Sequence, residues 1–361
     1  MTCPMTRIWA AKNFGVDKQS AMNASKTLKR LQDLPSKAAH FCLGVERFCR
    51  DLPGLDLSGQ TLLVAYSGGA DSRALLFVLY YLAPRLGITI HAAILDHALR
   101  PEAADEVKDA RAVCAGLGVP LHAHREDVAA FAREKGLGLE EAGRIARLRF
   151  LEDVRKDTGS AWIAMGHQLN DLAEDSVMRM VRGAGWPALA GMAAVSGEHH
   201  VLRPLLLTPR SELEAFLSAV GQTWHDDAMN EDDAYLRNRV RKYIIPRFLA
   251  ENPSYLDGVA ERWRMARTDE AFFRQQTEGL PTRSDGEGEF VSRDCLLECH
   301  SSVRQRKYME ILKRLGSGQA ASALLHALDN AWLRNEGGKT VQFPGGKRAV
   351  ILDGGIDFRK I

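Results

Sequence analysis

Hydrophobic positions along the first two thirds of the chain follow two different periods. Four short apolar runs have the length and composition of buried β-strands, at residues 61–66, 88–95, 120–125 and 161–165. Longer stretches between them have apolar positions at helical spacing. Because strands that alternate with helices form parallel sheets, this pattern predicts an α/β domain with a parallel sheet and helices on both of its faces. Ligands of such sheets bind at the carboxyl ends of the strands.

The segments on either side of this alternation have different patterns. An amphipathic pattern precedes it, and a basic helical pattern follows it, up to a charged, glycine-bearing stretch near Leu280. The last segment combines a helical part with a β-like end. We therefore predict an N-terminal helical extension (1–57), the α/β domain (58–224), a basic helical linker (225–280) and a small α+β C-terminal domain (281–361).

Composition disfavours several classes of protein. The 361 residues carry a formal net charge of only +2, so any basic surface has to be local. The six cysteines are scattered and form no CxxC pair, which is unlike a secreted disulfide scaffold. No apolar run has the length of a membrane span, and the N-terminus lacks the apolar core of a signal peptide. We therefore expect a cytoplasmic protein without membrane contact.

The turn after the first predicted strand has the sequence SGGADS, from Ser67 to Ser72. Glycines permit a close backbone approach, and the start of the next helix offers unpaired N–H groups to an anion, such as phosphate. The two serines add hydroxyl donors, and the Asp71 carboxylate is suited to hold Mg²⁺ beside phosphate oxygens. The alternative is a plain strand-to-helix turn in which the helix dipole favours Asp71.

Two later strands also end in chemically capable residues. Asp96 follows the second strand. We expect its carboxylate either to lie beside a nucleotide or to cap a turn. After the fourth strand, His167, Asp171 and Glu174 fall at i, i+4 and i+7, which predicts that they share one helix face. The two carboxylates suit an ammonium group, which they hold or deprotonate. The alternatives are surface pairs with nearby arginines, or a zinc site, which the absence of HExxH and of a cysteine cluster disfavours.

Arginines are concentrated in two predicted helices. Arg144 and Arg147 lie one turn apart, suited to phosphate or simply to solvent. The linker stretch YLRNRVRKYIIPRF has no acidic residue and contains Arg237, Asn238, Arg239, Arg241 and Lys242. Such a run suits phosphate contacts with RNA, and pairing with the acidic stretch before it is the alternative.

The order of these motifs resembles that of the tRNA(Ile)-lysidine synthetase family, in the PP-loop ATP pyrophosphatase superfamily. SGGADS is similar to the PP-loop. It is followed by DHALRPE, an ARxxR-like helix, GHQLNDLAE, RGAGWPALAGM and DDAMNEDDAYLRNRVR. The superfamily shares the glycine turn, whereas RGAGxxxLAGM followed by RNxxR resembles this family in particular. The resemblance covers about Leu62 to Pro246, with a weaker similarity at the C-terminus.

The resemblance implies a PP-loop fold and a ligase that modifies RNA. The family uses ATP to adenylate the C2 oxygen of the wobble cytidine in an isoleucine tRNA with a CAU anticodon, releasing PPi. The amine of free lysine then displaces AMP, so that lysidine is formed. The cofactors implied are ATP and Mg²⁺, and the partners implied are this tRNA and free lysine.

By the same resemblance, each motif acquires a role. The residues expected to bind ATP are Ser67, Gly68, Gly69, Ala70, Asp71, Ser72, Asp96, Arg144 and Arg147. The residues expected to be catalytic are Asp71, His167, Asp171, Glu174 and Arg237, with Asp71 also contacting Mg²⁺. The residues expected to contact tRNA are Arg237, Asn238, Arg239, Arg241 and Lys242.

Three other functions fit part of the pattern. A PP-loop tRNA-modifying enzyme such as a cytidine 2-thiolation enzyme shares the turn but relies on cysteines, and Cys295 and Cys299 lie where the resemblance is poorest. A PP-loop amide ligase for a small molecule would not need the RNxxR segment. A nucleotide-binding regulatory protein would keep the turn and lose the carboxylates. The sequence leaves a homodimer open.

Overall fold

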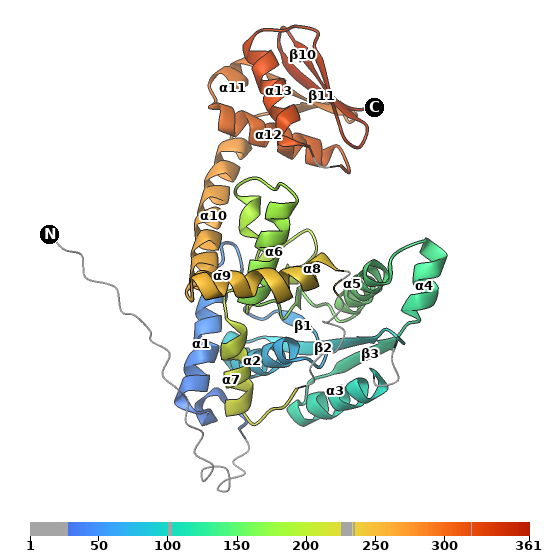
Figure 1. Cartoon of the computed structure of the whole chain (residues 1–361), viewed down its shortest axis with the longest axis vertical. Coiled ribbons are helices and arrows are strands. Elements are labelled where there is room, and N and C mark those ends of the chain that lie inside the picture. Colours follow the sequence, from blue (N-terminus) through green and yellow to red (C-terminus); the bar gives the residue numbers. More distant parts are fainter. Residues whose placement is uncertain (1–27, 100–102, 225–232, 234, 319) are drawn as a thin grey trace, which may run out of the picture.

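Two β-sheets, each with its own helices, are joined by one long helix. The computed structural model describes residues 28–99, 103–224, 233, 235–318 and 320–361. Helix α10 (Tyr255–Glu278) leads from the larger unit to the smaller C-terminal unit (Figure 1). None of the described helices combines the length and apolar character needed to cross a bilayer.

The sheet of the larger unit confirms the predicted α/β class. Its strands β1 (Thr61–Ala65), β2 (Thr89–Asp96), β3 (Leu121–Arg125), β4 (Trp162–Ala164), β5 (Val195–Ser196) and β6 (Val201–Leu202) lie in the order β3-β2-β1-β4-β6-β5. All neighbouring pairs are parallel except β5 with β6. The chain passes from β1 to β2 on one side and reaches β4 on the other, so the strand order reverses between β1 and β4. Ligands of open α/β sheets bind at such a point.

Alternate residues of β1 supply the two faces of this sheet. Leu62 and Val64 belong to the core beneath α2 (Ala70–Leu86), whereas Leu63 packs with residues of α5 (Leu139–Asp157). Helix α3 (Ala103–Leu117) contacts β2 and β3, and α4 (Val128–Lys135) packs against α5. All four side chains of β1 that follow Thr61 are apolar because this central strand is covered on both faces.

The N-terminal helix α1 (Ser36–Arg50) packs into the core of the larger unit. Its buried residues include Ala38 and Cys42, which belong to the core shared with α2. The rings of Phe41 on α1 and Phe216 on α7 (Arg210–Ala219) stack with centroids 4.9 Å apart. A short 3-10 helix, η2 (Leu31–Asp33), precedes α1. The described part of the predicted extension, from Leu28 onward, therefore contributes to the body that carries the sheet.

Several helices lie above the carboxyl ends of the strands. Helix α6 (Leu169–Val181) follows β4, and the 3-10 turn η3 (Ala188–Ala190) comes after it. The basic linker forms α8 (Leu236–Arg239), a π-helical turn η5 (Val240–Ile244) and α9 (Ile245–Glu251), before α10 begins. Both α8 and η5 contact α6, so the linker crosses the sheet edge where a ligand is expected (Figure 1).

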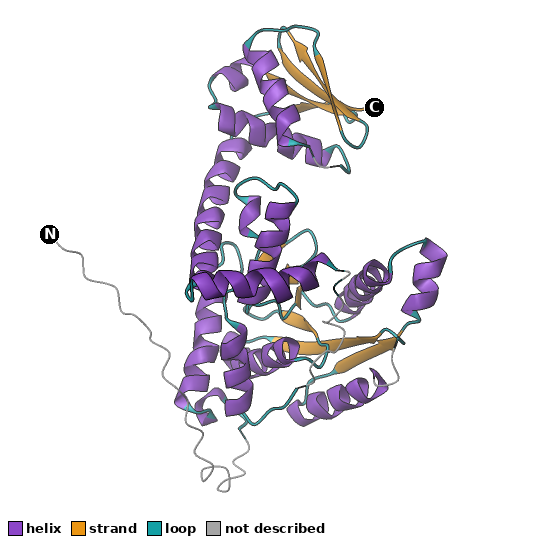
Figure 2. Ribbon diagram, viewed as in Figure 1, coloured by secondary structure: helices purple, strands orange, loops and turns teal. Residues whose placement is uncertain are grey.

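The C-terminal unit is a separate α+β structure, as predicted (Figure 2). Its antiparallel strands, in the order β7-β8-β11-β10-β9, are β7 (Arg283–Ser284), β8 (Gly288–Ser292), β9 (Thr340–Phe343), β10 (Lys347–Leu352) and β11 (Gly355–Lys360). Helices α11 (Arg293–Leu297), α12 (Ser301–Arg314) and α13 (Ser322–Leu333) cover the sheet. The buried Lys347 ammonium donates to three backbone carbonyls, at 2.8–3.1 Å, and so satisfies the end of α12.

Close packing of the loop after β4 leads to a prediction about a methyl group added at Gly166. A Cβ added to Gly166 would lie 2.9 Å from the carbonyl carbon of Asp71, at the start of α2. We expect Gly166→Ala to lower the free energy of unfolding by about 1–3 kcal/mol through overpacking, measured by urea denaturation. The matched control is Gly116→Ala on α3, where a Cβ meets nothing within 4 Å. Equal stability of the Gly166 variant and the wild type would contradict this packing.

Candidate functional site

Three segments meet at the carboxyl ends of β1 and β4. The first is the turn from β1 to α2, the second is the loop from β4 into α6, and the third is the linker formed by α8 and η5. They come from parts of the sequence about a hundred residues apart. The strand reversal between β1 and β4 brings the first two together, and the linker covers both (Figure 1).

The glycine turn has the geometry of an anion site. Gly68 has a φ of +81°, which favours glycine, and Gly69 is the N-cap of α2 without a capping side chain. Helix α2 begins at Ala70, so the N–H groups of its first turn have no carbonyl partner within the helix. The helix dipole adds positive potential at the same place. Gly68, Gly69 and Ala70 are therefore placed where the sequence predicts phosphate.

The two serines of the turn have different surroundings. Ser72 is buried, and its hydroxyl donates to the Gly69 carbonyl at 3.1 Å. The same oxygen accepts from the backbone N–H of Ser67 at 3.1 Å and lies 3.1 Å from the Ser67 hydroxyl. The Ser72 hydroxyl thus has partners inside the turn, and its predicted contact with ATP stays a prediction. Ser67 is exposed at the mouth of the turn.

Asp71 is the residue of the turn that best fits a cation. Its Oδ1 is buried and has no hydrogen-bond partner among the described residues. Burial, together with the negative charge of Asp171, raises the pKa of Asp71 to about 6, against the opposing effect of Arg210 and Arg241. A buried carboxylate oxygen without a partner, beside a phosphate-binding turn, fits Mg²⁺, which prefers such ligands. A bound Mg²⁺ would neutralise phosphate oxygens there.

His167 does not lie on the helix face predicted for it. Helix α6 begins at Leu169, with Gln168 as its N-cap, so His167 belongs to the preceding loop. Its Nδ1 accepts a hydrogen bond from Nε of Arg203 at 3.2 Å. Burial and the charge of Arg203 lower the pKa of His167 to about 3, so the imidazole is neutral at neutral pH. With Nδ1 accepting, the proton lies on Nε2, which makes this ring a donor rather than a base.

Asp171 and Glu174 face the linker and are held by two arginines. Arg237 donates from Nη2 to Asp171 Oδ1 at 2.6 Å and from Nε to Glu174 Oε2 at 2.8 Å. Arg241 donates from Nε to Glu174 Oε1 at 2.6 Å and from Nη2 to Oε2 at 3.0 Å. The remaining oxygen, Asp171 Oδ2, accepts from the backbone N–H of Gln168 at 3.0 Å. We call these four charged residues the carboxylate–arginine cluster.

Because Glu174 is buried, its negative charge has to be compensated by nearby positive charges. The side chain of Glu174 is only 3% exposed, and its charge is compensated by two guanidiniums that are each about one third exposed. Burial alone would lower the pKa of Arg237, but the attraction of Asp171 and Glu174 outweighs it and raises that pKa. The alternative of ordinary pairs on α6 is wrong for these two acids, since Arg179 pairs with Asp175 instead.

The other basic residues of the linker point elsewhere. Arg239 donates to the Asp233 carbonyl at 2.7 Å, and the Lys242 ammonium lies 3.3 Å from the Asp233 carboxylate. Tyr243 donates to the same carboxylate at 2.6 Å. Asn238 lies on α8 between Arg237 and Arg239. The predicted RNA-contacting run is thus divided. Two arginines face the carboxylates, while Arg239 contacts the backbone carbonyl of Asp233 and Lys242 contacts its carboxylate.

Three further residues predicted near ATP lie at the rim of the site. Asp96 Oδ1 accepts from the backbone N–H of Ala98 at 2.8 Å, so this carboxylate caps the turn after β2. Arg144 is exposed and pairs with Glu141 on its own helix, at 2.9–3.0 Å. Arg147 is exposed as a residue, yet desolvation by the surrounding protein and the like charges of Arg237 and Arg144 lower the pKa of its guanidinium. The charge of Arg237, a member of the cluster, thus acts on Arg147.

Sequence reasoning missed three residues that shape the site. Arg203, just after β6, orients His167, and Arg210 contributes to the electrostatics of Asp71. Gly166 gives the start of α2 its close approach to the β4 loop. The signals were present, because Gly166 follows a predicted strand and the two arginines are the first and last residues of the segment RPLLLTPR, at 203–210. Nothing in the sequence alone links those positions to specific partners.

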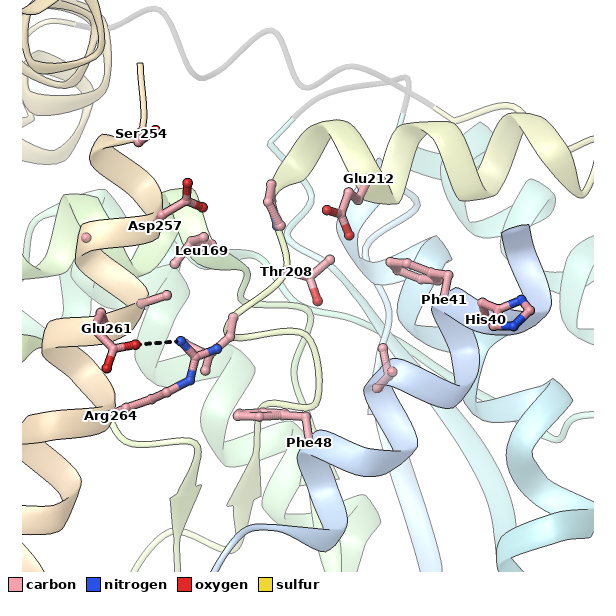
Figure 3. A pocket seen from close by; sticks show the side chains of 16 residues that line it. His40, Phe41, Phe48, Leu169, Thr208, Glu212, Ser254, Asp257, Glu261 and Arg264 are labelled. Atoms are coloured by element: carbon pink, nitrogen blue, oxygen red, sulfur yellow. Dashed lines mark hydrogen bonds and ion pairs between the residues drawn. The ribbon is translucent and has the colours of Figure 1, made fainter. Parts of the chain in front are cut away.

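A separate cavity of about 800 Å³ lies between α1, α7 and α10 (Figure 3). It is lined by apolar residues such as Phe41 and Phe48 and by the charged Glu212, Glu261 and Arg264. Glu261 and Arg264 pair across one turn of α10 at 3.2 Å. None of the residues predicted for ATP, lysine or RNA lines this cavity. It therefore carries no weight in assigning the chemistry.

Comparisons with known proteins agree with this geometry. A family model described as the PP-loop domain matches residues 43–248. The tRNA(Ile)-lysidine synthase of Nitratidesulfovibrio vulgaris is 42% identical over 315 residues, which cover 82% of this chain and 91% of that protein. The enzyme of the same name from Geobacter sulfurreducens is 35% identical over 72% of this chain, and that match spans 56% of its length.

A solved structure supports the fold alone. The U34-tRNA thiolase of Methanococcus maripaludis superposes with a TM-score of 0.52 at 16% identity, over 63% of this chain and 79% of that one. The fold and the glycine turn thus define a PP-loop domain protein. Within that class, the similarity to the Nitratidesulfovibrio protein shows that the chain belongs to the tRNA(Ile)-lysidine synthase family.

Because the Asp71 carboxylate is buried, we predict that its ionisation lowers the free energy of unfolding. The folded protein binds this proton more tightly than the unfolded chain does, because the pKa is raised to about 6. The free energy of unfolding therefore falls as the pH rises from about 4 to about 6, and the loss is complete above that range. Asp71→Asn removes this cost. We expect the variant to be about 1–3 kcal/mol more stable than the wild type near neutral pH, in the absence of nucleotide and metal.

Urea denaturation at about pH 5 and about pH 7.5 checks this expectation, since the gain should be larger at the higher pH. Asp105→Asn, at an exposed position of α3, is the matched control and should show no such difference. A stability gain that is the same at both pH values would contradict a raised pKa at Asp71.

Proposed function

We propose that the chain uses ATP to join lysine to C2 of the wobble cytidine in an isoleucine tRNA with a CAU anticodon. The reaction passes through an adenylated tRNA and releases PPi and AMP. As a member of the tRNA(Ile)-lysidine synthase family, the chain is a ligase. The observation that carries the proposal is the meeting of the phosphate-binding turn, the buried carboxylates and the linker arginines at one sheet edge.

The turn supports the ATP part of the proposal. Free N–H groups at the start of α2, the exposed Ser67 and the Asp71 carboxylate are arranged to receive a triphosphate with its Mg²⁺. Activation converts the cytidine oxygen into part of a good leaving group, AMP. The neutral Nε2–H of His167 is a donor suited to an oxygen that gains negative charge, such as one of a phosphate.

The carboxylates support the lysine part, with one condition set by the structure. Every carboxylate oxygen of Asp171 and Glu174 already accepts a hydrogen bond, and two guanidiniums balance the two negative charges. An incoming lysine ammonium therefore has to replace one guanidinium. Phosphates of ATP or tRNA are natural acceptors for the arginine that is released. Once held there, the ammonium can lose its proton to a carboxylate and attack the activated carbon.

Sulfur transfer, the nearest alternative, has no support from the cysteines of the described residues. Cys42, Cys49 and Cys114 are buried in the core, and burial raises the pKa of each thiol. Cys295 and Cys299 lie in the C-terminal unit, on and just after α11. Thiolate chemistry needs a lowered pKa and access to substrate.

The direct test is incorporation of radiolabelled lysine into CAU-anticodon tRNA transcripts, with ATP and Mg²⁺. Glu174→Gln should reduce incorporation by at least about 100-fold, because the carboxylate that holds and deprotonates the amine is lost. ATP affinity, measured by calorimetry, should change little. Glu152→Gln, which breaks an ordinary surface pair with Arg155, is the matched control. If no CAU transcript accepts lysine while ATP still binds, the substrate assignment is wrong.

The proposed replacement of an arginine side chain by the lysine substrate at Glu174 leads to a second prediction. Arg241→Gln removes one competitor for Glu174, so free enzyme without tRNA should bind lysine about tenfold more tightly, measured by equilibrium dialysis. The control is Arg239→Gln, since Arg239 contacts the Asp233 carbonyl rather than the two acids. Unchanged or weaker lysine binding by the Arg241 variant would show that the guanidinium does not compete with the ammonium.

A further inference from the structure

The C-terminal end of α6 exposes an unusual set of side chains. Met180, Val181 and Trp186 are 54%, 61% and 39% exposed, within seven positions of the chain. Arg182, between them, is exposed and forms no ion pair with any described residue. Isolated exposed apolar residues are ordinary, but a group beside an uncompensated arginine calls for a partner. We call these four residues the α6-end patch.

Trp186 is held in position although much of it meets solvent. Its indole N–H donates to Asp269 of α10 at 2.7 Å. Its carbonyl accepts from Arg306 of α12 at 3.5 Å, and the Arg306 guanidinium stacks on Phe273, 3.5 Å from the ring centroid. The polar edge of the indole is thus satisfied within the protein. An aromatic ring fixed in this way loses little conformational freedom when a planar group stacks on it.

The surroundings of the patch are basic. Besides Arg182 and Arg306 they include Arg267, and Arg179 and Arg274, whose like charges both act on Arg267. Three acids lie among them: Asp175 pairs with Arg179 at 2.8 Å, Glu270 pairs with Arg267 at 2.6 Å, and Asp269 binds Trp186. Arginines outnumber carboxylates, so the surface attracts an anion. Aromatic and basic side chains together are typical of surfaces that bind single-stranded nucleic acid.

The position of the patch relates it to the chemistry. Glu174 and Val181 lie on the same helix, seven residues apart, which corresponds to about 10 Å along its axis. Stacked bases are spaced by about 3.4 Å, so about three nucleotides span this distance. Three apolar side chains also fall short of the roughly 20 residues a side that a stable protein interface uses. A nucleic-acid loop continuous with the reacting base fits better than a second protein.

We propose that the α6-end patch binds unpaired anticodon-loop nucleotides next to the base that is modified. Trp186 stacks on a base, Met180 and Val181 contact its neighbours, and Arg182 binds a phosphate. This inference rests on the proposed function, because it takes the RNA loop of the tRNA substrate as the occupant. It assigns a role to the RGAGWPALAGM segment, which the chemistry at Asp171 and Glu174 leaves without one.

Binding of a fluorescently labelled anticodon stem-loop RNA to the full chain tests the proposal. Trp186→Ala should weaken binding by about 5- to 100-fold, since one stacked base contributes about 1–3 kcal/mol. Trp186→Phe should retain most of the affinity, because it keeps an aromatic face. Arg182→Gln should reduce the slope of log affinity against log salt by about 0.7–0.9, as expected for one lost phosphate contact. Leu333→Ala, which truncates an exposed apolar residue of α13, is the control.

The outcomes separate this inference from the proposed function. Wild-type affinity and salt slope in both the Trp186→Ala and Arg182→Gln variants would overturn it, whatever lysine incorporation shows. A change in molar mass in solution without a change in RNA affinity would assign the patch to a second copy of the chain and overturn it as well. If the wild type binds RNA but incorporates no lysine, the proposed ligation is wrong. Loss of RNA affinity in the patch variants would then still support the proposed role of the patch. Retained affinity in Trp186→Phe excludes a folding defect.

Discussion

The carboxylate–arginine cluster is the interaction on which the arrangement of the site depends. It joins residues 63–67 positions apart in the chain and ties the linker to α6. A glutamate as buried as Glu174 needs compensating charge, since an unpaired carboxylate there would be strongly destabilising. The linker is therefore held over the sheet edge by electrostatic demand as well as by apolar packing, which includes the buried Val240 and Ile245. Any ligand that replaces one of these four side chains in its pairing therefore weakens the attachment of the linker to α6.

A second constraint is steric and concerns backbone alone. Gly68 adopts a positive φ so that the chain can turn directly from β1 into α2, and Gly166 lets the β4 loop approach the start of that helix. The two glycines sit on either side of the point where strand order reverses. Because no side chain separates the two loops, Asp71 lies close enough to Asp171 for the two charges to interact. Burial is the larger cause of the raised pKa of Asp71, and the charge of Asp171 adds to it.

The sequence allowed the elements to be predicted more fully than their contacts. Strand and helix periods sufficed for the parallel sheet, because β1 is apolar throughout and the helices are long. The two-residue strands β5 and β6 have no period to read. His167 was assigned to a helix face because spacing alone does not locate a helix start. The signal was the Gln168–Asp171 capping box, which places the start after His167. Partners such as Arg203 and His167 depend on the tertiary fold.

Ion pairs with carboxylates compensate much of the positive charge of the linker in this nearly neutral chain. Arg237 and Arg241 are neutralised by Asp171 and Glu174, and Lys242 lies beside Asp233, so little of the linker's charge is uncompensated while these pairs are intact. A polyanion that draws an arginine away leaves a buried carboxylate in need of a cation, and in the proposed reaction the lysine ammonium is that cation. A cation that enters first releases an arginine for phosphate. Under the proposed function, the polyanion and lysine therefore favour each other's binding through the same four side chains, and such a linkage is reciprocal.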